Sequence, residues 1–481
     1  MKKSLKNQVL NGLAWRGTSD VLQQILQIVF TIVLARLLTK GDFGLVAMAL
    51  LVNRFVKSVT NVSFGTAVIQ SQTITNGQIS AVFFIQLTIN VFLTILVYLG
   101  SDFASDFFNE PELVDVIKVL SFLILLQSLQ FPNILLQKKM SFKSFSIAQI
   151  VSMIISNLTA IVLAFLGFGL WSLVYRLLIY SAVYGILSSY YGKWIPEKPN
   201  FKGLNTIMKF GFNLLGRNIF YFFAENLIGL MTGKFLGKEV MGVFNIAYNL
   251  AIVPANKIQN VLTNVLTSGF SKIQLQTVKF RNNYKKALSY TSIFFIPFML
   301  VLSVSSINFI PVLYGKKWEE AGMFLMVLSI VGVFRGLSHM IRTAIVSKGN
   351  SRVVLISAFI ELVISLPIMY LAMKDFGVPG LIVGYLIGAF SSLLYLSIWF
   401  DLVLESKFLF IKSIHKGLFI GVVIFICNYF LNFINESNFT ILVLKLSFSV
   451  VIFSFSIFYF ERDLIMKILH KINKLFIIRK N

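Results

Sequence analysis

Charged and amide side chains recur at helical spacing within stretches of this sequence that are otherwise apolar. Arg16, Asp20 and Gln27 lie on one face of residues 12–38, because residues about four or seven positions apart share a side of a helix. A guanidinium group binds a phosphate through two parallel hydrogen bonds, and amide side chains bind hydroxyl groups. The stripes therefore predict a mainly cationic cavity that accepts an anionic substrate.

Two roles are predicted for the residues of these stripes. Asp20 and Glu225 are predicted to couple transport to an ion, since each has a base nearby, Arg16 or Arg217, that can pair with its carboxylate and for which an arriving anionic substrate would compete. A structural role stays open, because an Arg can anchor a helix at the membrane interface and Asn side chains can join helices. The predicted substrate contacts are Arg16, Arg54, Arg217, Asn249, Lys257 and Arg335.

The composition places these stripes inside a membrane. Of the 481 residues, 57% are hydrophobic and 13% are charged, which is about half the charge of a soluble domain. With 1 Cys and 3 scattered His, no metal site, cofactor or disulfide framework is predicted. We expect an all-α polytopic membrane protein with about 14 spans. The expected spans are 12–38, 43–64, 79–101, 113–136, 146–166, 169–191, 206–232, 240–266, 287–311, 320–346, 353–373, 378–402, 416–434 and 438–460.

The basic residues between the spans predict the orientation of the chain. With the N-terminus in the cytoplasm, cytoplasmic segments hold 26 Lys and Arg against 6 on the opposite face. Because positive residues accumulate on the cytoplasmic side, both termini are expected there. The net charge of +24 is thus explained by basic residues that gather on the cytoplasmic side of the membrane, and no nucleic-acid partner is predicted. The basic tail, residues 461–481, is expected to lie on the inner leaflet as an amphipathic helix.

The chain also carries an internal repeat. The segment ARLLTKGDFGLVAMA at 35–49 aligns with GKFLGKEVMGVFNIA at 233–247, so that Lys40 matches Lys238 and Gly44 matches Gly242. We therefore expect two pseudo-symmetric six-helix lobes, residues 1–200 and 201–403, followed by two extra spans and the tail, residues 404–481.

Several further segments carry a resemblance to a known family. FGTAVIQ at 64–70, FFNEPEL at 107–113, VLYGKKWEEA at 312–321 and GFGLW at 167–171 join the repeat segments in resembling polysaccharide flippases of the multidrug/oligosaccharidyl-lipid/polysaccharide exporter superfamily. The resemblance implies a lipopolysaccharide-, colanic-acid- or teichuronic-acid-type flippase in a bacterial cytoplasmic (inner) membrane. It implies that an undecaprenyl-diphosphate-linked oligosaccharide is moved across the membrane by alternating access. It further implies a cavity lined largely by helices 1, 2, 7 and 8.

Two other functions stay open at this point. A cation-coupled exporter of small molecules belongs to the same superfamily, although bases outnumber acids in the predicted cavity. A membrane glycan polymerase needs a sizeable outer loop with catalytic groups, and the predicted outer loops are short. We therefore expect a transporter and no enzyme. Its partners are expected to be the lipid-linked glycan and membrane lipids, and the resemblance also allows contacts with other polysaccharide-assembly proteins.

The predicted orientation can be tested by cysteine labelling with an impermeant reagent. A cysteine at position 108, in the acidic segment between two spans, should react from outside the cell, and one at position 140 should not. The reverse pattern of labelling would contradict the placement of both termini in the cytoplasm.

Overall fold

The protein is described from a computed structural model, which covers residues 5–60, 68–69, 74–202, 215–434 and 436–460. Over these residues the regular secondary structure is entirely helical. The predicted amphipathic tail, residues 461–481, lies outside the described residues. The helices are α1 (Leu5–Leu37), α2 (Lys40–Thr60), α4 (Asn76–Leu99), α5 (Ser101–Phe108), α6 (Leu113–Leu126), η1 (Gln127–Gln130), α7 (Pro132–Lys138), α8 (Phe142–Phe165), α9 (Leu170–Gly192), α11 (Leu215–Ser271), α12 (Thr277–Tyr314), η2 (Lys316–Trp318), α13 (Ala321–Ser347), α14 (Ser351–Phe376), α15 (Val378–Val403), α16 (Leu409–Phe430), η3 (Leu431–Phe433) and α17 (Asn438–Phe460).

Many of these helices are long and apolar enough to cross a bilayer. The described residues contain 11 such helices by length and composition. That count leaves out α2 and α11, which carry much of the polar pattern. The prediction of an all-α polytopic membrane protein is confirmed, and the number of 14 spans stays a prediction.

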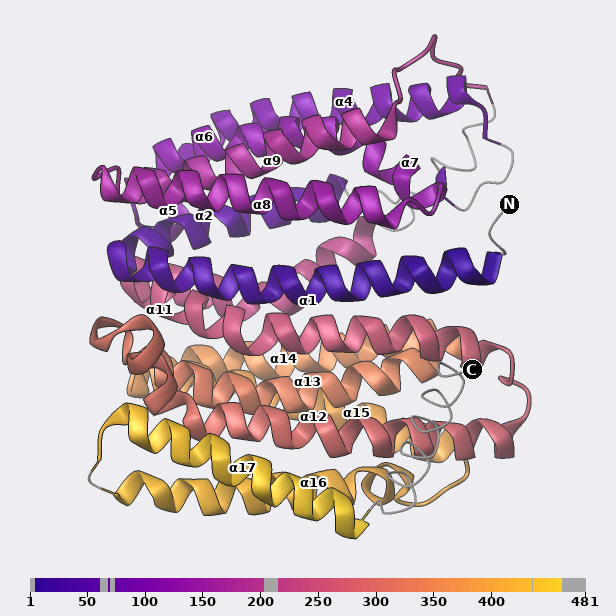
Figure 1. The fold of residues 1–481 in the computed structure, drawn as a ribbon, viewed down its shortest axis with the longest axis vertical. Coiled ribbons are helices and arrows are strands. Elements are labelled where there is room, and N and C mark those ends of the chain that lie inside the picture. The colour runs from indigo at the N-terminus through magenta and orange to yellow at the C-terminus, as the bar shows by residue number, and fades with distance from the viewer. Residues whose placement is uncertain (1–4, 61–67, 70–73, 203–214, 435, 461–481) are drawn as a thin grey trace, which may run out of the picture. The chain divides into compact units, whose positions relative to one another are not determined.

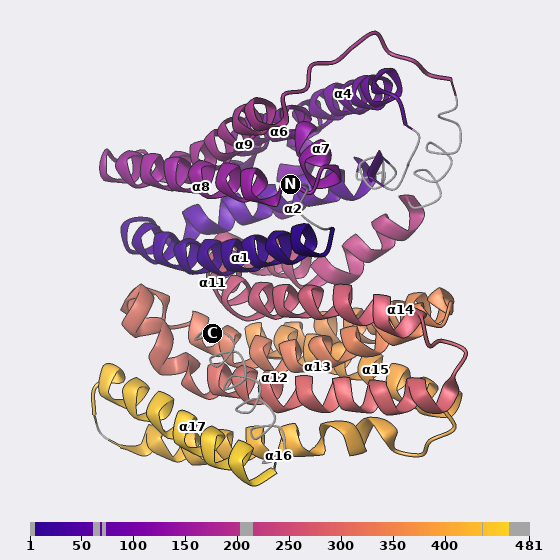
Figure 2. The ribbon, with the colours of Figure 1, turned by 45° about the vertical axis from the view of Figure 1, so that its right-hand side comes forward.

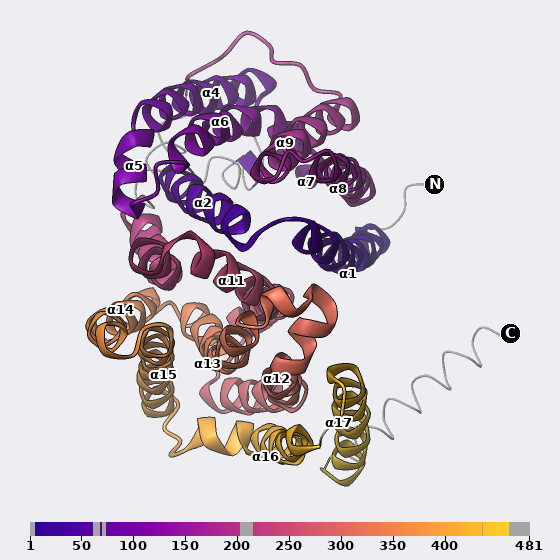
Figure 3. The ribbon, with the colours of Figure 1, turned by 90° about the vertical axis from the view of Figure 1, so that its left-hand side faces the viewer.

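The helices form two compact units, Met1–Asn245 and Ile246–Asn481. In the first unit, α4, α6, α8 and α9 run alongside α1 and α2, as seen nearly end-on in Figure 3. In the second unit, α12, α13, α14 and α15 pack on one another, and α16 and α17 lie beside α12 (Figures 1 and 2). The six-helix lobes with boundaries at residues 200 and 403 stay a prediction.

The longest helix, α11, replaces two of the expected spans. Its 57 residues are helical except at Gly237, whose φ of 77° and ψ of −179° interrupt the helix between the expected spans 206–232 and 240–266. The interruption is held by an acidic segment: the Lys238 N–H donates to Glu110 Oε1 at 3.1 Å, and the Lys238 ammonium donates to Glu112 Oε1 at 2.8 Å. The hydrogen bond from Lys238 to Glu112 raises the pKa of the ammonium, and the charges of Glu112 and Glu110 act in the same direction. The break at Gly237 is thus held by the segment that follows α5.

The two copies of the repeat meet where α2 crosses α11. A Cβ atom on Gly44 would lie 1.7 Å from the carbonyl oxygen of Lys238, and one on Gly242 would lie 2.0 Å from that of Lys40. The contact is reciprocal, since each glycine faces the backbone of the residue four positions before the other. Small residues allow such backbone contacts between membrane helices. The matched positions found in the sequence are therefore matched contacts in the structure.

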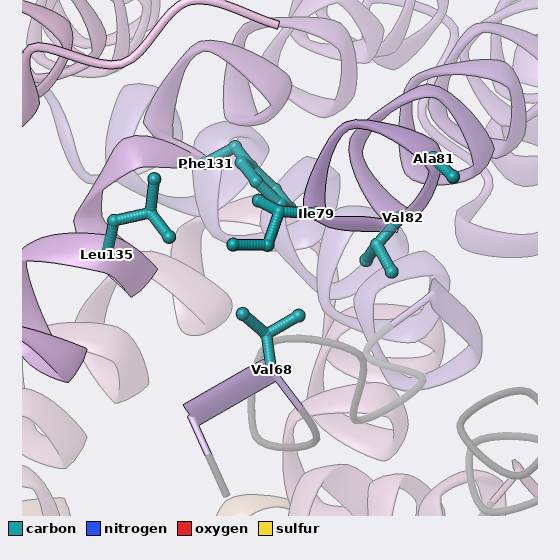
Figure 4. Packing of buried hydrophobic residues seen from close by; sticks show 6 residues of the cluster. All are labelled: Val68, Ile79, Ala81, Val82, Phe131 and Leu135. Carbon is teal, nitrogen blue, oxygen red and sulfur yellow. The ribbon is translucent and has the colours of Figure 1, made fainter. Parts of the chain in front are cut away.

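A small apolar cluster joins α4 to α7 within the first unit (Figure 4). Val68 lies against Ile79 and Val82 of α4, against Leu135 of α7 and against Phe131, the residue just before α7, and all five side chains are buried. The Lys138 ammonium at the end of α7 donates to the Val68 carbonyl oxygen at 3.0 Å. The cluster and this hydrogen bond fix the short segment at Val68 between two helices.

The structure also refines the labelling positions for the orientation test. The Phe108 side chain is 3% exposed, whereas Phe103 in the same helix, α5, is 81% exposed. The native Cys427 is exposed and would react as well. Labelling is therefore best carried out at positions 103 and 140 in a Cys427→Ser background.

We predict that Gly44→Ala and Gly242→Ala each lower the stability and the abundance of the protein sharply. A methyl group at either position would overlap a backbone carbonyl, and backbone cannot move aside as a flexible side chain can. Thermal unfolding in detergent measures the effect. Gly17→Ala is the matched control, because nothing lies within 4 Å of a Cβ atom there. A melting temperature unchanged by Gly44→Ala would contradict the close crossing.

Candidate functional site

The polar stripe of α1 packs in part against α8. The guanidinium group of Arg16 lies 5.3 Å from the centre of the Phe145 ring, and Gln23 donates to Gln149 Oε1 at 3.4 Å. Arg16 is exposed and Asp20 is half-buried. Among the described residues no salt bridge joins Arg16 to Asp20, so that the expected pairing is replaced by the contact with Phe145. The Arg16 charge is therefore not neutralised by the neighbouring carboxylate.

The stripe of α2 lies beside the first half of α11. Arg54 is exposed, and its Nη1 donates to Asn226 Oδ1 at 3.4 Å. Phe55 on α2 is 5.3 Å from Phe222 on α11, measured between ring centres, in an edge-to-face arrangement. Glu225, one residue before Asn226, is exposed. The structure thus brings Arg54 of α2 to the Asn226 amide of α11, next to Glu225. The charged groups of Arg54 and Glu225 both stay exposed.

Three further predicted substrate contacts lie on α11, and the structure describes the side chain of one of them. Arg217 and Lys257 lie in α11, and their side chains are outside the described residues. Asn249 is exposed in the second half of the same helix. A role in substrate binding stays a prediction for all six substrate contacts, and a role in ion coupling stays a prediction for Asp20 and Glu225.

Arg335, on α13, is held by a carboxylate that the sequence analysis did not single out. Its Nη2 donates to Glu361 Oε1 on α14 at 2.6 Å, and its guanidinium lies 4.8 Å from the centre of the Tyr385 ring on α15. Arg342, two turns further along α13, donates to Glu361 Oε2 at 3.5 Å and to the Ser392 hydroxyl at 3.0 Å. We call Arg335, Arg342 and Glu361 the charge cluster of α13 and α14.

The charge cluster has a net charge of +1, because two guanidinium groups share one carboxylate. The Glu361 side chain is 8% exposed, against 18% for Arg335 and 26% for Arg342. Both carboxylate oxygens accept from guanidinium groups, so Glu361 is committed to contacts within the second unit. The signal in the sequence was a single acidic residue, Glu361, within the apolar span 353–373. In the span before it, Arg335 and Arg342 lie seven positions apart and so share one helix face.

An apolar groove of about 680 Å³ lies along the second unit. It is lined by α12, by Ile258 of α11, by Ile424 of α16 and by one face of α17. Phe294, Phe298 and Phe453 supply aromatic walls, and Ser449 contributes a hydroxyl group. Phe294 and Phe298 are each about half exposed. The groove can therefore accept a long hydrocarbon chain from the surrounding lipid.

We predict that Glu361→Gln destabilises the protein by about 3 kcal/mol, the lower end of the range for a fully buried pair, because it leaves two half-buried guanidinium groups without a counter-charge. Adding Arg342→Met to Glu361→Gln should recover part of the loss. Chemical or thermal unfolding of the purified protein measures both effects, and Glu319→Gln at an exposed position is the control. If the Glu361→Gln variant were as stable as the wild type, the cluster would not be what holds the helices together.

Comparisons with known proteins agree with the all-helical membrane fold. Lipopolysaccharide biosynthesis protein WzxC of Escherichia coli (strain K12) is 27% identical over 389 residues, which are 80% of this chain and 79% of that protein. Teichuronic acid biosynthesis protein TuaB of Bacillus subtilis (strain 168) is 27% identical over 72% of this chain and 73% of its own length. The solved structure of lipid II flippase MurJ in an inward closed conformation superposes with a TM-score of 0.75 at 17% identity, covering 93% of this chain and 99% of MurJ. The model of the family described as polysaccharide biosynthesis protein matches residues 33–323. Since that match spans more than half of the chain, the protein belongs to the polysaccharide biosynthesis protein family.

Proposed function

We propose that the protein flips an undecaprenyl-diphosphate-linked oligosaccharide across the bacterial cytoplasmic membrane for the synthesis of a surface polysaccharide. Its family supports this role, as do two relatives that are named for lipopolysaccharide and teichuronic acid biosynthesis. The fold is shared with a protein named as a lipid II flippase. Both termini lie in the cytoplasm in this proposal.

The observation that carries the proposal is the exposure of basic side chains on two helices, α1 and α2, that the sequence predicts to span the membrane. Arg16 and Arg54 are exposed on α1 and α2, although a charge at the bilayer centre costs about 2.5–3.5 kcal/mol on insertion scales. Water or an anionic ligand must offset that cost. Arg16, Arg54 and Arg217 bind the diphosphate in this proposal, because guanidinium groups match phosphate oxygens in geometry and charge. Asn226, next to Arg54, offers an amide to the sugar hydroxyls.

The lipid tail follows the apolar groove. A polyprenyl chain cannot enter a cationic cavity without losing its apolar surroundings, so it stays in contact with lipid while the head group crosses. The groove beside α12 and α17 provides aromatic and aliphatic walls for such a chain. The head group and the tail thus bind surfaces of opposite character.

The driving force is assigned to an ion gradient. Glu225 is exposed and Asp20 is half-buried, so that both carboxylates can exchange a proton or a sodium ion with water. In this proposal a diphosphate bound at Arg217 competes with Glu225 for that base, and a diphosphate bound at Arg16 keeps Arg16 from pairing with Asp20. Such competition gives a substrate different affinities in the two states of an alternating-access cycle. A cation-coupled exporter of drugs is the second candidate, and it would favour a cavity in which acids outnumber bases.

We predict that Arg54→Ala and Arg217→Ala abolish glycan export while the protein remains at wild-type abundance. Each change removes a charge-assisted hydrogen bond worth about 1.5–3 kcal/mol. Export is measured by mass analysis of lipid-linked glycans in each leaflet after the variants replace the wild-type gene. Arg54→Lys should retain part of the activity, since the charge remains and the paired donors are lost.

Lys40→Ala serves as the control for these variants, because its side chain lies at the start of α2, away from the polar stripe. It should export glycan normally. Normal export by both Arg variants would contradict a diphosphate site on these helices. Accumulation of a small cationic compound in place of lipid-linked glycan would favour the drug exporter.

A further inference from the structure

The last membrane helix, α17, has little in its sequence to determine which side faces the protein. Lys445 is its single charged residue, and apolar residues occur on every face. Its buried residues are Ile441, Leu442, Lys445 and Ser449. Within lipid there is no hydrophobic force between helices, so apolar residues alone cannot select a face. Two of the four buried residues are polar, and they lie one turn apart.

Lys445 is fully buried and forms three hydrogen bonds. Its ammonium donates to Asn308 Oδ1 at 2.6 Å, to the Val304 carbonyl oxygen at 2.9 Å and to Asn432 Oδ1 at 2.5 Å. An ammonium has three donors, and all three are used. The acceptors come from α12 and from η3, which follows α16. Among the described residues no carboxylate forms a salt bridge with Lys445.

Two further contacts extend this arrangement along α17. The Asn428 amide on α16 donates to the Ser449 hydroxyl at 2.9 Å. The Asn308 amide donates to Asn438 Oδ1 at 2.8 Å, at the first residue of α17. We call Asn308, Asn428, Asn432, Lys445 and Ser449 the polar seam of α17.

The polar seam adjoins the apolar groove. Ser449 belongs to both, and Leu446, Val450 and Phe453 of α17 line the groove. Val301 on α12 lines the groove as well, and Val304, one turn further, accepts from Lys445. Along α12 the groove therefore ends where the seam begins, and the rotation of α17 determines which of its side chains form the wall.

A buried charge is a poor source of stability. Replacing a buried ionic group by an apolar one of similar volume is often neutral or stabilising, whereas polar groups in helix contacts can fix register and orientation. The geometry of the seam fits the second role, because the ammonium can reach its three acceptors in one rotation and one axial position of α17. A slip of one residue would turn Lys445 about 100° around the helix, toward lipid.

We propose that Lys445 is a positioning residue: it fixes the rotation of α17 on α12 and thereby shapes the groove that receives the lipid tail. This inference rests on the proposed function, since the tail is assigned to the groove there. Lys445 itself touches no substrate and acts through the wall that α17 presents.

Cross-linking tests the position of α17 directly. Phe294 and Phe453 lie 5.6 Å apart between ring centres, on α12 and α17. In a Cys427→Ser background, cysteines at 294 and 453 should be joined by a short bifunctional maleimide reagent, which spans the space that the two rings fill. Lys445→Met should lower the yield several-fold without lowering the melting temperature. Lys374→Met, at an exposed lysine of α14, is the matched control and should leave the yield unchanged.

Chain-length preference tests the groove. Purified protein in nanodiscs is titrated with undecaprenyl phosphate and with farnesyl phosphate, which share a head group and differ in tail length. The wild type should bind the longer chain more tightly, and Lys445→Met should reduce that preference several-fold while farnesyl phosphate binding stays the same. Asn432→Ala removes one acceptor and should shift both readouts in the same direction, and it replaces Lys445→Met if that variant does not fold.

The outcomes separate the two claims. An unchanged cross-link in Lys445→Met overturns the positioning role. A reduced cross-link with an unchanged chain-length preference overturns the link between α17 and the groove. A wild type that binds both phosphates equally contradicts the lipid-tail part of the proposed function, and the cross-link then still decides whether Lys445 fixes α17.

Discussion

The cost of placing a charge in a bilayer determines where every ionised side chain of this protein can lie. The chain meets that cost in three ways. In the charge cluster, Glu361 accepts from Arg335 and Arg342 and leaves one excess positive charge. In the polar seam, Lys445 is surrounded by neutral acceptors. On α1 and α2, Arg16 and Arg54 remain exposed, and water or substrate must solvate them.

These three solutions correspond to three different functions. The charge cluster joins α13 to α14 within the second unit and so gives a rigid group of helices. The polar seam orients a helix that has no preferred face. Within the part of the chain that the structure describes, no carboxylate forms a salt bridge with Arg16 or Arg54, so their guanidinium groups are accessible to an anion. Whether a charge is satisfied within the protein is therefore the physical criterion on which the proposed assignment of Arg16 and Arg54 to the substrate rests.

The sequence was sufficient for the helices and insufficient for their pairings. Apolar runs of about 20 residues predict the spans, because the bilayer thickness sets their length. Glu361 and Lys445 escaped notice because a lone charge within an apolar run shows no spacing pattern, and their partners are distant in the sequence. Arg335 was recognised as polar and membrane-embedded, but its pairing with Glu361 depends on how α13 and α14 pack. The break in α11 at Gly237 was foreseen as a loop, and it is a single residue held by Lys238 and the acidic segment.

The crossing of α2 and α11 bears on how the two copies of the repeat can diverge. Each glycine faces a backbone carbonyl, so the contact depends on the absence of a side chain and on no particular partner side chain. A change at one glycine cannot be compensated by a change of residue opposite, because every residue supplies the same carbonyl group. Neighbouring positions pack through their side chains, so that a change there can be compensated by a change in the side chain opposite. Two duplicated segments can thus lose nearly all their similarity while Gly44 and Gly242 persist, and these two positions preserve a record of the duplication.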